Sequence, residues 1–233
     1  MKYLKRTIVG ILLLTVTPIL VLRWVDPPTS AFMLQTKIKA WWNNQDAFHV
    51  RYRWVNWEKI SPHAPLAVVA AEDQKFPFHW GFDRQAITDA WQERVEGIRF
   101  RGASTISQQV AKNLFLWPGK SFIRKGIEAY FTLLIEILWS KQRILEVYLN
   151  IAEFGNGVYG VGAASKTFFA KAPNRLKRRE CALMAAVLPS PSRLHLSRPS
   201  SYVLSRSEWI LEEMERLNRL QKKPYLYDLR GWF

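Results

Sequence analysis

The sequence predicts an all-α protein in which an N-terminal membrane helix precedes one helical domain. From Pro62 onward, apolar residues recur mostly at the three- and four-residue spacing of amphipathic helices. Alternation of apolar and polar residues, which indicates strands, never runs beyond a few positions, and neither repeats nor a βαβ rhythm occur. The 233 residues, 48% of them hydrophobic, suffice for one well-buried domain and a small appendage.

Residues 1–25 predict a single-pass membrane anchor. Residues 7–22 carry no charge, and Arg23 with Trp24 extends the run to Val25, close to the ~20 residues that cross a bilayer. The basic residues before this run place the N-terminus in the cytoplasm and the remaining chain outside the bacterial cytoplasmic (inner) membrane, in the periplasm or its extracytoplasmic equivalent. A cleaved signal peptide is the alternative, because Thr29-Ser30-Ala31 resembles a cleavage site, but the long run favours the anchor.

The net charge of +15 indicates an anionic partner. Nucleic acid, anionic lipid headgroups and a phosphorylated substrate would all fit this charge, but an exported domain does not meet nucleic acid. The single cysteine, Cys181, lies in an apolar helical run, which predicts a core residue and not a disulfide. The four histidines are scattered, so no metal-ligand set is predicted.

The remaining chain divides into a linker and a helical domain. Residues 26–60 are rich in aromatic side chains and suggest an irregular, membrane-proximal linker, whereas residues 61–233 form the domain. Its first helix ends at Glu72-Asp73, and a second starts at Asp83, carries Ile87 on its apolar face and stops near Gly97. Further helices are predicted after the caps Thr105, Ser121 and Ser140, after the glycine-rich turn at 155–162, over 178–188 and from about Ser201 to Leu220.

The most polar helix start is the segment RGASTISQQVAKN at residues 101–113. Thr105, Gln108 or Gln109, and Lys112 recur at helical spacing and therefore share one face. Hydroxyls and amides suit sugars and an ammonium suits phosphate, so this face fits a sugar phosphate. The alternative is a capping box, Thr105-x-x-Gln108, on an ordinary solvated helix.

Acidic residues end the first helix of the domain. Glu72 and Asp73 lie where the helix dipole disfavours carboxylates, which favours a functional role. A glutamate among apolar groups can have a raised pKa, as a general base near neutrality requires. His79 alone is more typical of a hydrogen-bonded structural histidine.

Basic residues follow within fourteen positions: Lys112, Lys120, Arg124 and Lys125. If the two helices that carry them fold against each other, these side chains form a cationic pocket for a pyrophosphate. The alternative is that Arg124 and Glu128 form a helix-surface ion pair of a few tenths of a kcal/mol.

Five segments, in order, resemble the signatures of the peptidoglycan glycosyltransferases, glycosyltransferase family 51. They are Glu72-Asp73-x-x-Phe76-x-x-His79-x-Gly81, Gly102-x-Ser104-Thr105-Ile106-x-Gln108-Gln109-x-x-Lys112-Asn113, Arg124-Lys125-x-x-Glu128, Ile144-Leu145-Glu146-x-Tyr148-Leu149-Asn150 and Glu180-x-Ala182-x-x-Ala185-Ala186-x-Leu188-Pro189-x-Pro191. One such motif would be weak, but five in order over residues 72–191 are specific.

The resemblance implies a lysozyme-like glycosyltransferase domain that polymerises lipid II into β-1,4-linked glycan strands and releases undecaprenyl pyrophosphate. Glu72 would be the general base for the acceptor GlcNAc 4-hydroxyl, which attacks C1 of the donor MurNAc with inversion. Glu128 would be the second catalytic residue, beside the donor pyrophosphate. The implied substrate-binding residues are Ser104, Thr105, Gln108, Gln109, Lys112, Asn113, Lys120 and Arg124, of which Lys112 and Arg124 neutralise the leaving pyrophosphate.

The resemblance requires no cofactor, although it leaves open a divalent cation, Mg²⁺ or Mn²⁺, at the donor pyrophosphate. The partners that it implies are lipid II, the growing glycan strand, the cytoplasmic membrane bilayer and other cell-wall synthesis proteins, with no nucleic acid. The chain has no Ser-x-x-Lys signature and is too short for a fused transpeptidase domain, so a monofunctional enzyme is expected.

One departure from the family pattern and one apolar run lie close together in the sequence, at Lys120 and at residues 114–117. Lys120 stands where the family usually has arginine, and lysine keeps the charge but loses the bidentate geometry, so its phosphate contact is less secure. The apolar run Leu114–Trp117 matches the family's membrane-facing jaw, with ordinary core as the alternative.

Two other functions stay open. A lysozyme-type, glycan-cleaving enzyme also needs an acid beside a sugar groove, but its neutral bond does not require the cations around Lys112 and Arg124. A basic, membrane-anchored scaffold without enzyme activity explains the anchor and the charge, but not the polar Gln108-Gln109 pair.

Overall fold

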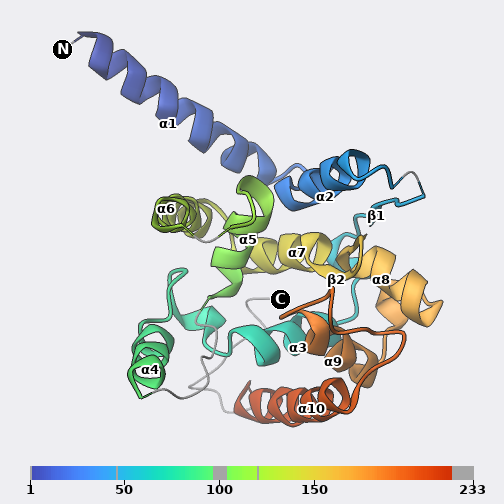
Figure 1. Ribbon diagram of the computed structural model, residues 1–233. Helices are drawn as coiled ribbons and strands as arrows, with labels where there is room; N and C mark the ends of the chain where they lie inside the picture. The colour runs from blue at the N-terminus through green and yellow to red at the C-terminus, as the bar shows by residue number, and fades with distance from the viewer. Residues whose placement is uncertain (1, 46, 97–103, 120, 222–233) are drawn as a thin grey trace.

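A computed structural model describes residues 2–45, 47–96, 104–119 and 121–221. It shows a helical domain from which the first helix projects (Figure 1). The elements are α1 (Lys2–Leu22), α2 (Ala31–Trp42), β1 (Arg51–Tyr52), η1 (Trp57–Lys59), α3 (His63–Glu72), η2 (Phe76–Phe78), α4 (Arg84–Val95), α5 (Ile106–Phe115), α6 (Phe122–Leu138), α7 (Lys141–Ile151), β2 (Glu153–Gly155), β3 (Val158–Tyr159), α8 (Gly160–Phe169), η3 (Pro173–Arg175), α9 (Arg178–Val187) and α10 (Ser201–Gln221). The predicted all-α class is confirmed.

The short strands form one small sheet in the order β1-β3-β2. β1 pairs with β3 in parallel, and β2 pairs with β3 antiparallel with an irregularity between Glu153 and Gly155. These strands contain only two or three residues each, which explains why no alternating pattern announces them.

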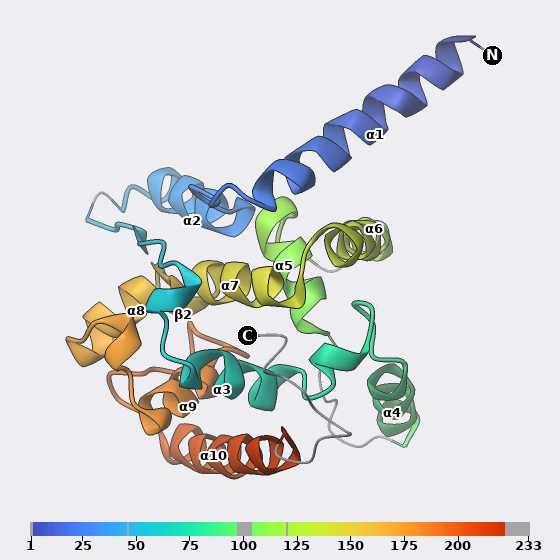
Figure 2. The same cartoon turned by 180° about the vertical axis from the view of Figure 1, so that it is seen from behind.

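The core is built around α7, which crosses the middle of the domain between α5 and α8 (Figure 1). Almost every residue of α7 from Ile144 to Ile151 is buried. α3 is apolar on all sides and packs against α9, and both helices carry small buried residues such as Ala67 and Ala182. α10 packs along both helices on the side opposite α7 (Figure 2). Cys181 lies in this core, and burial raises the pKa of its thiol to about 12.

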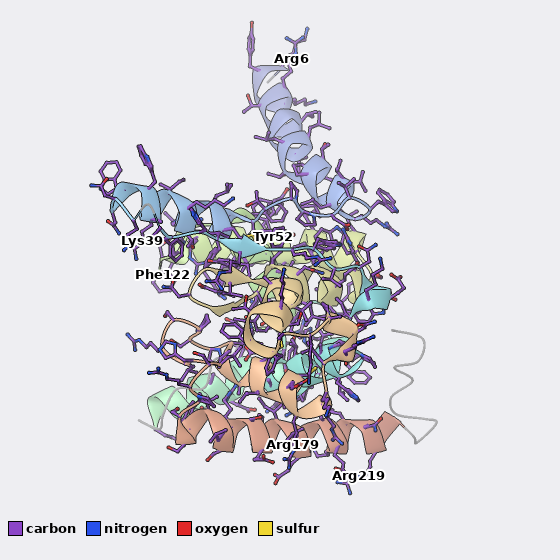
Figure 3. The ribbon with its side chains drawn as sticks, turned by 90° about the vertical axis from the view of Figure 1, so that its right-hand side faces the viewer. Arg6, Lys39, Tyr52, Phe122, Arg179 and Arg219 are labelled. Carbon is purple, nitrogen blue, oxygen red and sulfur yellow. The ribbon has the colours of Figure 1, made fainter. Side chains whose placement is uncertain are left out.

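α1 meets the domain through polar contacts on α6 and at the end of α6. Tyr130 shares a hydrogen bond of 2.8 Å with Thr15, and the indole of Trp139 donates to the carbonyl of Ile19 at 2.8 Å. Arg143 on α7 donates to the carbonyls of Leu22 and Val25. These hydrogen bonds tie the C-terminal half of α1 to the domain. In Figure 3, Arg6 lies at the far end of α1, and Arg219 on α10 lies at the opposite end of the molecule.

α6 carries three of its four charged residues inward and several of its large apolar residues outward. Arg124, Glu128 and Glu136 are buried, whereas Phe122 and Ile123 are 97% and 78% exposed. α2 also has exposed apolar residues, namely Leu34, Ile38, Trp41 and Trp42. Both helices lie beside α5, at the end of the domain from which α1 leaves (Figure 1). We call the outward residues of α2 and α6 the apolar rim.

Three expectations from the sequence need correction or limits. Residues 26–60 are not irregular throughout, because Ser30 caps α2 and Val55 and Ile60 join the core. Ile87 on α4 is 46% exposed, so it does not lie on a buried face. Gly97 and Lys120 lie outside the described residues, and the boundaries drawn at residues 25 and 60 stay predictions.

Candidate active site

Glu72 is the last residue of α3, and its side chain is 13% exposed. Gln109 of α5 donates from Nε2 to Glu72 Oε2 at 2.9 Å, and Tyr148 of α7 donates to Gln109 Oε1 at 3.1 Å. The tyrosine therefore orients the amide so that its N–H groups face the carboxylate. Burial raises the pKa of Glu72, while the Gln109 hydrogen bond lowers it. Glu72 is thus a held, poorly solvated carboxylate.

Asp73 is buried and has a structural role. Its Oδ1 pairs with His79 Nε2 at 2.8 Å, and its Oδ2 accepts from the backbone N–H of Ile106 at 3.0 Å. These bonds join the end of α3 to η2 and to the start of α5. His79 is therefore a hydrogen-bonded histidine next to the site, as its sequence context favoured, and Glu72 is the acid that remains available.

The start of α5 forms the predicted capping box. Thr105 Oγ1 accepts from Gln108 N, and Gln108 Oε1 accepts from Thr105 N at 3.0 Å. Thr105 also donates to the carbonyl of Gly81 at 2.7 Å. Gly81 has φ +78° and a Cβ there would lie 2.6 Å from Thr132, so no other residue fits. Both capping side chains are buried and bound within the protein, and their sugar contacts stay a prediction.

Three basic side chains form a cationic cluster next to this part of α5. Lys112 lies one helical turn after Gln109 on α5, and Arg124 and Lys125 lie on α6. Arg124 donates to Glu128 Oε2 and to the Gly119 carbonyl, both at 2.7 Å, and Lys125 donates to Glu128 Oε1 at 2.5 Å. Both Arg124 and Glu128 are buried, so their ion pair is not the surface pair considered above.

Lys112 links the two halves of the site. Burial lowers the pKa of its ammonium, and the charge of Glu128 raises it, while Arg124 and Lys125 lower it and Glu72 raises it. The structure thus brings Glu72, Gln109, Lys112, Arg124 and Glu128 into one electrostatic neighbourhood. Ser104 is exposed and Asn113 half-buried at the two ends of the same segment. Lys120, next to Gly119, is outside the described residues.

The transglycosylase family model matches residues 40–215. The chain belongs to the transglycosylase family. Three relatives named "Biosynthetic peptidoglycan transglycosylase" are similar over nearly their whole length. That of Pseudomonas entomophila is 49% identical over 93% of this chain and 92% of its own, that of Xanthomonas campestris 51% over 87% and 82%, and that of Yersinia pseudotuberculosis 50% over 91% and 89%.

Membership of the transglycosylases confirms the family resemblance and the predicted enzyme class, a glycosyltransferase. The five signatures of this transglycosylase lie in different surroundings in the structure. The first three contribute most of the candidate site residues, and Tyr148 of the fourth holds Gln109. Asn150 of the fourth is buried and exchanges hydrogen bonds with both backbone groups of Val55 at 2.8 and 2.9 Å. Glu180 of the fifth accepts from the backbone N–H of Lys177 and caps α9.

Several side chains near the site were not predicted from the sequence. Ser107 and Lys141 both bind the buried Glu136, and Lys141 also donates to the His79 carbonyl at 2.6 Å. Arg206 of α10 lies 3.7 Å from Glu72. Tyr148 was visible as part of the fourth signature, but a lone arginine in the last helix carries no local signal.

The apolar run at the end of α5 is mostly core. Leu114 and Leu116 are buried, and Phe115 stacks on Phe131 with ring centroids 4.8 Å apart, so only Trp117 is largely exposed. The alternative of ordinary core therefore holds for most of this run. The apolar rim on α2 and α6 exposes more large apolar side chains than this run does.

Proposed function

We propose that this transglycosylase polymerises lipid II into β-1,4-linked glycan strands and releases undecaprenyl pyrophosphate. The observation that carries the proposal is a largely buried glutamate, Glu72, which Gln109 holds beside a cationic cluster on α5 and α6. A base next to an anion-binding site is what transfer of a sugar from a pyrophosphate requires. The names of the relatives agree with this chemistry.

Glu72 acts as the general base in the proposed reaction. The acceptor GlcNAc 4-oxygen forms a bond to C1 of the donor MurNAc and loses its proton to Glu72, while the bond from C1 to the pyrophosphate oxygen breaks. The raised pKa of Glu72 brings its basicity closer to neutrality, where proton transfer is most effective. A single displacement inverts the α-linked donor to a β-linkage, so no covalent enzyme intermediate is needed.

The cationic cluster stabilises the departing pyrophosphate, whose negative charge grows as the bond breaks. Glu128 holds Arg124 and Lys125 through both of its carboxylate oxygens. We therefore assign Glu128 the role of positioning these two cations. The sugar and phosphate groups of the substrate would contact Ser104, Thr105, Gln108, Gln109 and Asn113.

A divalent cation does not fit Glu128 as it stands, because both of its oxygens already accept from cationic groups. Among the described residues, His, Cys, Asp and Glu side chains form no group of three that could hold a metal ion. We therefore derive no step through a metal.

The proposed location is the extracytoplasmic face of the cytoplasmic membrane. α1 is long and apolar enough to cross a bilayer, with a mean hydropathy of 1.8 over Lys5–Leu22, although a signal sequence would pass the same test. Lys2, Lys5 and Arg6 favour a cytoplasmic N-terminus. The apolar rim lies at the end of the domain from which α1 leaves, where it can contact the bilayer and lipid-linked substrate.

The two alternatives explain less of the site. A glycan hydrolase does not need the three cations Lys112, Arg124 and Lys125 that surround Glu128, because its leaving group is a neutral sugar. A scaffold has no use for a carboxylate that is buried and oriented by Gln109 and Tyr148. Other cell-wall synthesis proteins remain expected partners of the enzyme.

Replacement of the base tests the proposal. Glu72→Gln keeps the shape of the side chain but cannot accept a proton, so the polymerisation rate on lipid II in detergent should fall by ~10²–10⁴-fold. Glu58→Gln, which alters an exposed glutamate in η1, serves as the matched control and should keep full activity. A folded Glu72→Gln enzyme with more than about a tenth of the wild-type rate contradicts the assignment. Release of muropeptides from finished sacculi would instead favour the hydrolase.

A further inference from the structure

An arginine from the last helix lies against the candidate base. Arg206 Nη2 is 3.7 Å from Glu72 Oε1 and 3.5 Å from the carbonyl oxygen of Ala71. Its side chain is 22% exposed, and its guanidinium lies 6.0 Å from the centroid of the Trp209 ring. Arg206 belongs to none of the five signatures and has no part in the cationic cluster.

We propose that Arg206 is a positioning residue for the reaction, which keeps the Glu72 carboxylate ionised and its Oε1 turned toward α10 before the acceptor arrives. This inference rests on the proposed function of Glu72 as general base. It concerns α10 of this chain, a helix that the chemistry described so far does not use.

The contacts of Glu72 divide between its two oxygens. Oε2 accepts the hydrogen bond of Gln109, and Oε1 faces Arg206. The separation of 3.7 Å is beyond the 2.7–3.2 Å of an N–H···O hydrogen bond, so the interaction is mainly that of two opposite charges. Oε1 therefore keeps lone pairs with which to accept the proton of a hydroxyl group.

The charged and titratable groups that face Glu72 come from α5, α7 and α10 and from Asp73, the C-cap of α3. Burial is the main influence and raises its pKa; the Gln109 hydrogen bond and the charges of Arg206 and Lys112 lower it, and Asp73 raises it. Tyr148 of α7 faces the same region, and its own pKa is raised well above the ordinary value by burial.

Among these groups, Arg206 is the cation available to Glu72 alone. Lys112 also faces Glu128, and in the proposed reaction it faces the pyrophosphate. Its charge is thus shared with the donor. Without Arg206, burial would favour the protonated carboxylic acid, which cannot act as a base.

The position of Arg206 is set by packing. α10 is anchored by a stripe of buried residues, Val203, Ile210, Met214 and Leu217. The contact with Ala71 adds a partner for a carbonyl of the last turn of α3, where carbonyls lack helical partners. One guanidinium thus joins α10 to both the backbone and the side chain at the end of α3.

The test is the pH dependence of kcat/KM for lipid II polymerisation by the full chain in detergent. Arg206→Gln should move the acid limb upward by about 1 pH unit, because loss of an adjacent opposite charge raises the pKa of a carboxylate. Above the new limb its kcat/KM should return to within a few-fold of wild type. Arg206→Lys keeps the charge and should show a clearly smaller shift.

Arg216→Gln is the matched control. Arg216 is on the same helix and binds Gln74, just after Glu72 in the sequence, and Glu213, but not Glu72 itself. Its variant should leave the acid limb in place. An unmoved limb in Arg206→Gln, or an equal loss of activity at every pH, overturns the inference. If Arg206→Gln does not fold, the limb of Arg206→Lys decides: a small upward shift supports the inference and no shift overturns it.

Glu72→Gln in the same assay separates this inference from the proposed function. An active Glu72→Gln enzyme that keeps the acid limb would remove Glu72 as the base, and Arg206 with it. An inactive Glu72→Gln enzyme together with an unmoved limb in Arg206→Gln would leave the base in place and overturn only the role of Arg206.

Discussion

Glu128 offers the strongest test of the cationic cluster, because one buried carboxylate holds two of its three members. Its side chain is 3% exposed and accepts from Arg124 at 2.7 Å and from Lys125 at 2.5 Å. Glu128→Gln removes the negative charge but keeps the size of the side chain and one oxygen for Arg124. The variant therefore probes the charge with little change in packing.

The expected loss of stability can be worked from these two contacts. A buried hydrogen bond between charged groups contributes about 1.5–3 kcal/mol, and this applies to Arg124, which is 10% exposed. Lys125 is 47% exposed, so solvent reduces its contact to at most about 1 kcal/mol. We expect Glu128→Gln to lower the free energy of unfolding by about 1.5–4 kcal/mol. At roughly 2–4 °C per kcal/mol for a chain of this size, the Tm should fall by roughly 3–16 °C.

Two measurements check this expectation in detergent: thermal unfolding, and affinity for a phosphoglycolipid inhibitor that imitates the donor. Affinity should fall as well, because loss of Glu128 lowers the pKa of Lys112 further and frees Arg124 from its fixed geometry. Glu213→Gln is the matched control, since Glu213 pairs with the half-exposed Arg216 and should change stability by no more than ~0.5 kcal/mol. Unchanged stability and affinity in Glu128→Gln would refute the counter-ion reasoning.

Three further predictions address other parts of the site and fold. Burial lowers the pKa of Lys112, so its positive charge is present below that pKa and is lost as the pH rises through it. Inhibitor affinity measured against pH should therefore fall on the alkaline side. Lys112→Arg, which stays charged, should abolish this fall. Asn150→Ala leaves the buried N–H and C=O of Val55 without partners and should lower the free energy of unfolding by about 2–5 kcal/mol in chemical denaturation, whereas the exposed Asn174→Ala should be neutral. If Lys120 contacts the pyrophosphate, Lys120→Arg should keep or raise turnover and Lys120→Ala should reduce it clearly; equal rates in wild type and Lys120→Ala would remove Lys120 from the site.

Local signals in the sequence were enough to predict most of the helices. Thr105, Ser121 and Ser140 each accept the backbone N–H of the residue three positions ahead, as an N-cap does. α2 was missed although Ser30 caps it in the same way. Its segment, AFMLQTKIKAWW, is supported by distant partners, since Gln35 donates to the Leu116 carbonyl and Thr36 bonds to Tyr159. Such support cannot be read from local spacing.

The sequence by itself determined the all-α class, the family and the types of residue in the site, because these follow from helical period, caps and short motifs. Only the tertiary structure decided which of two adjacent amides contacts Glu72: the capping box engages Gln108, and Gln109, one helical step of about 100° further round, binds Glu72. It also decided that Asp73 is spent on His79 and Ile106, and that Arg206 lies beside the base. These choices depend on contacts between helices far apart in the sequence, which packing sets and which no local pattern encodes.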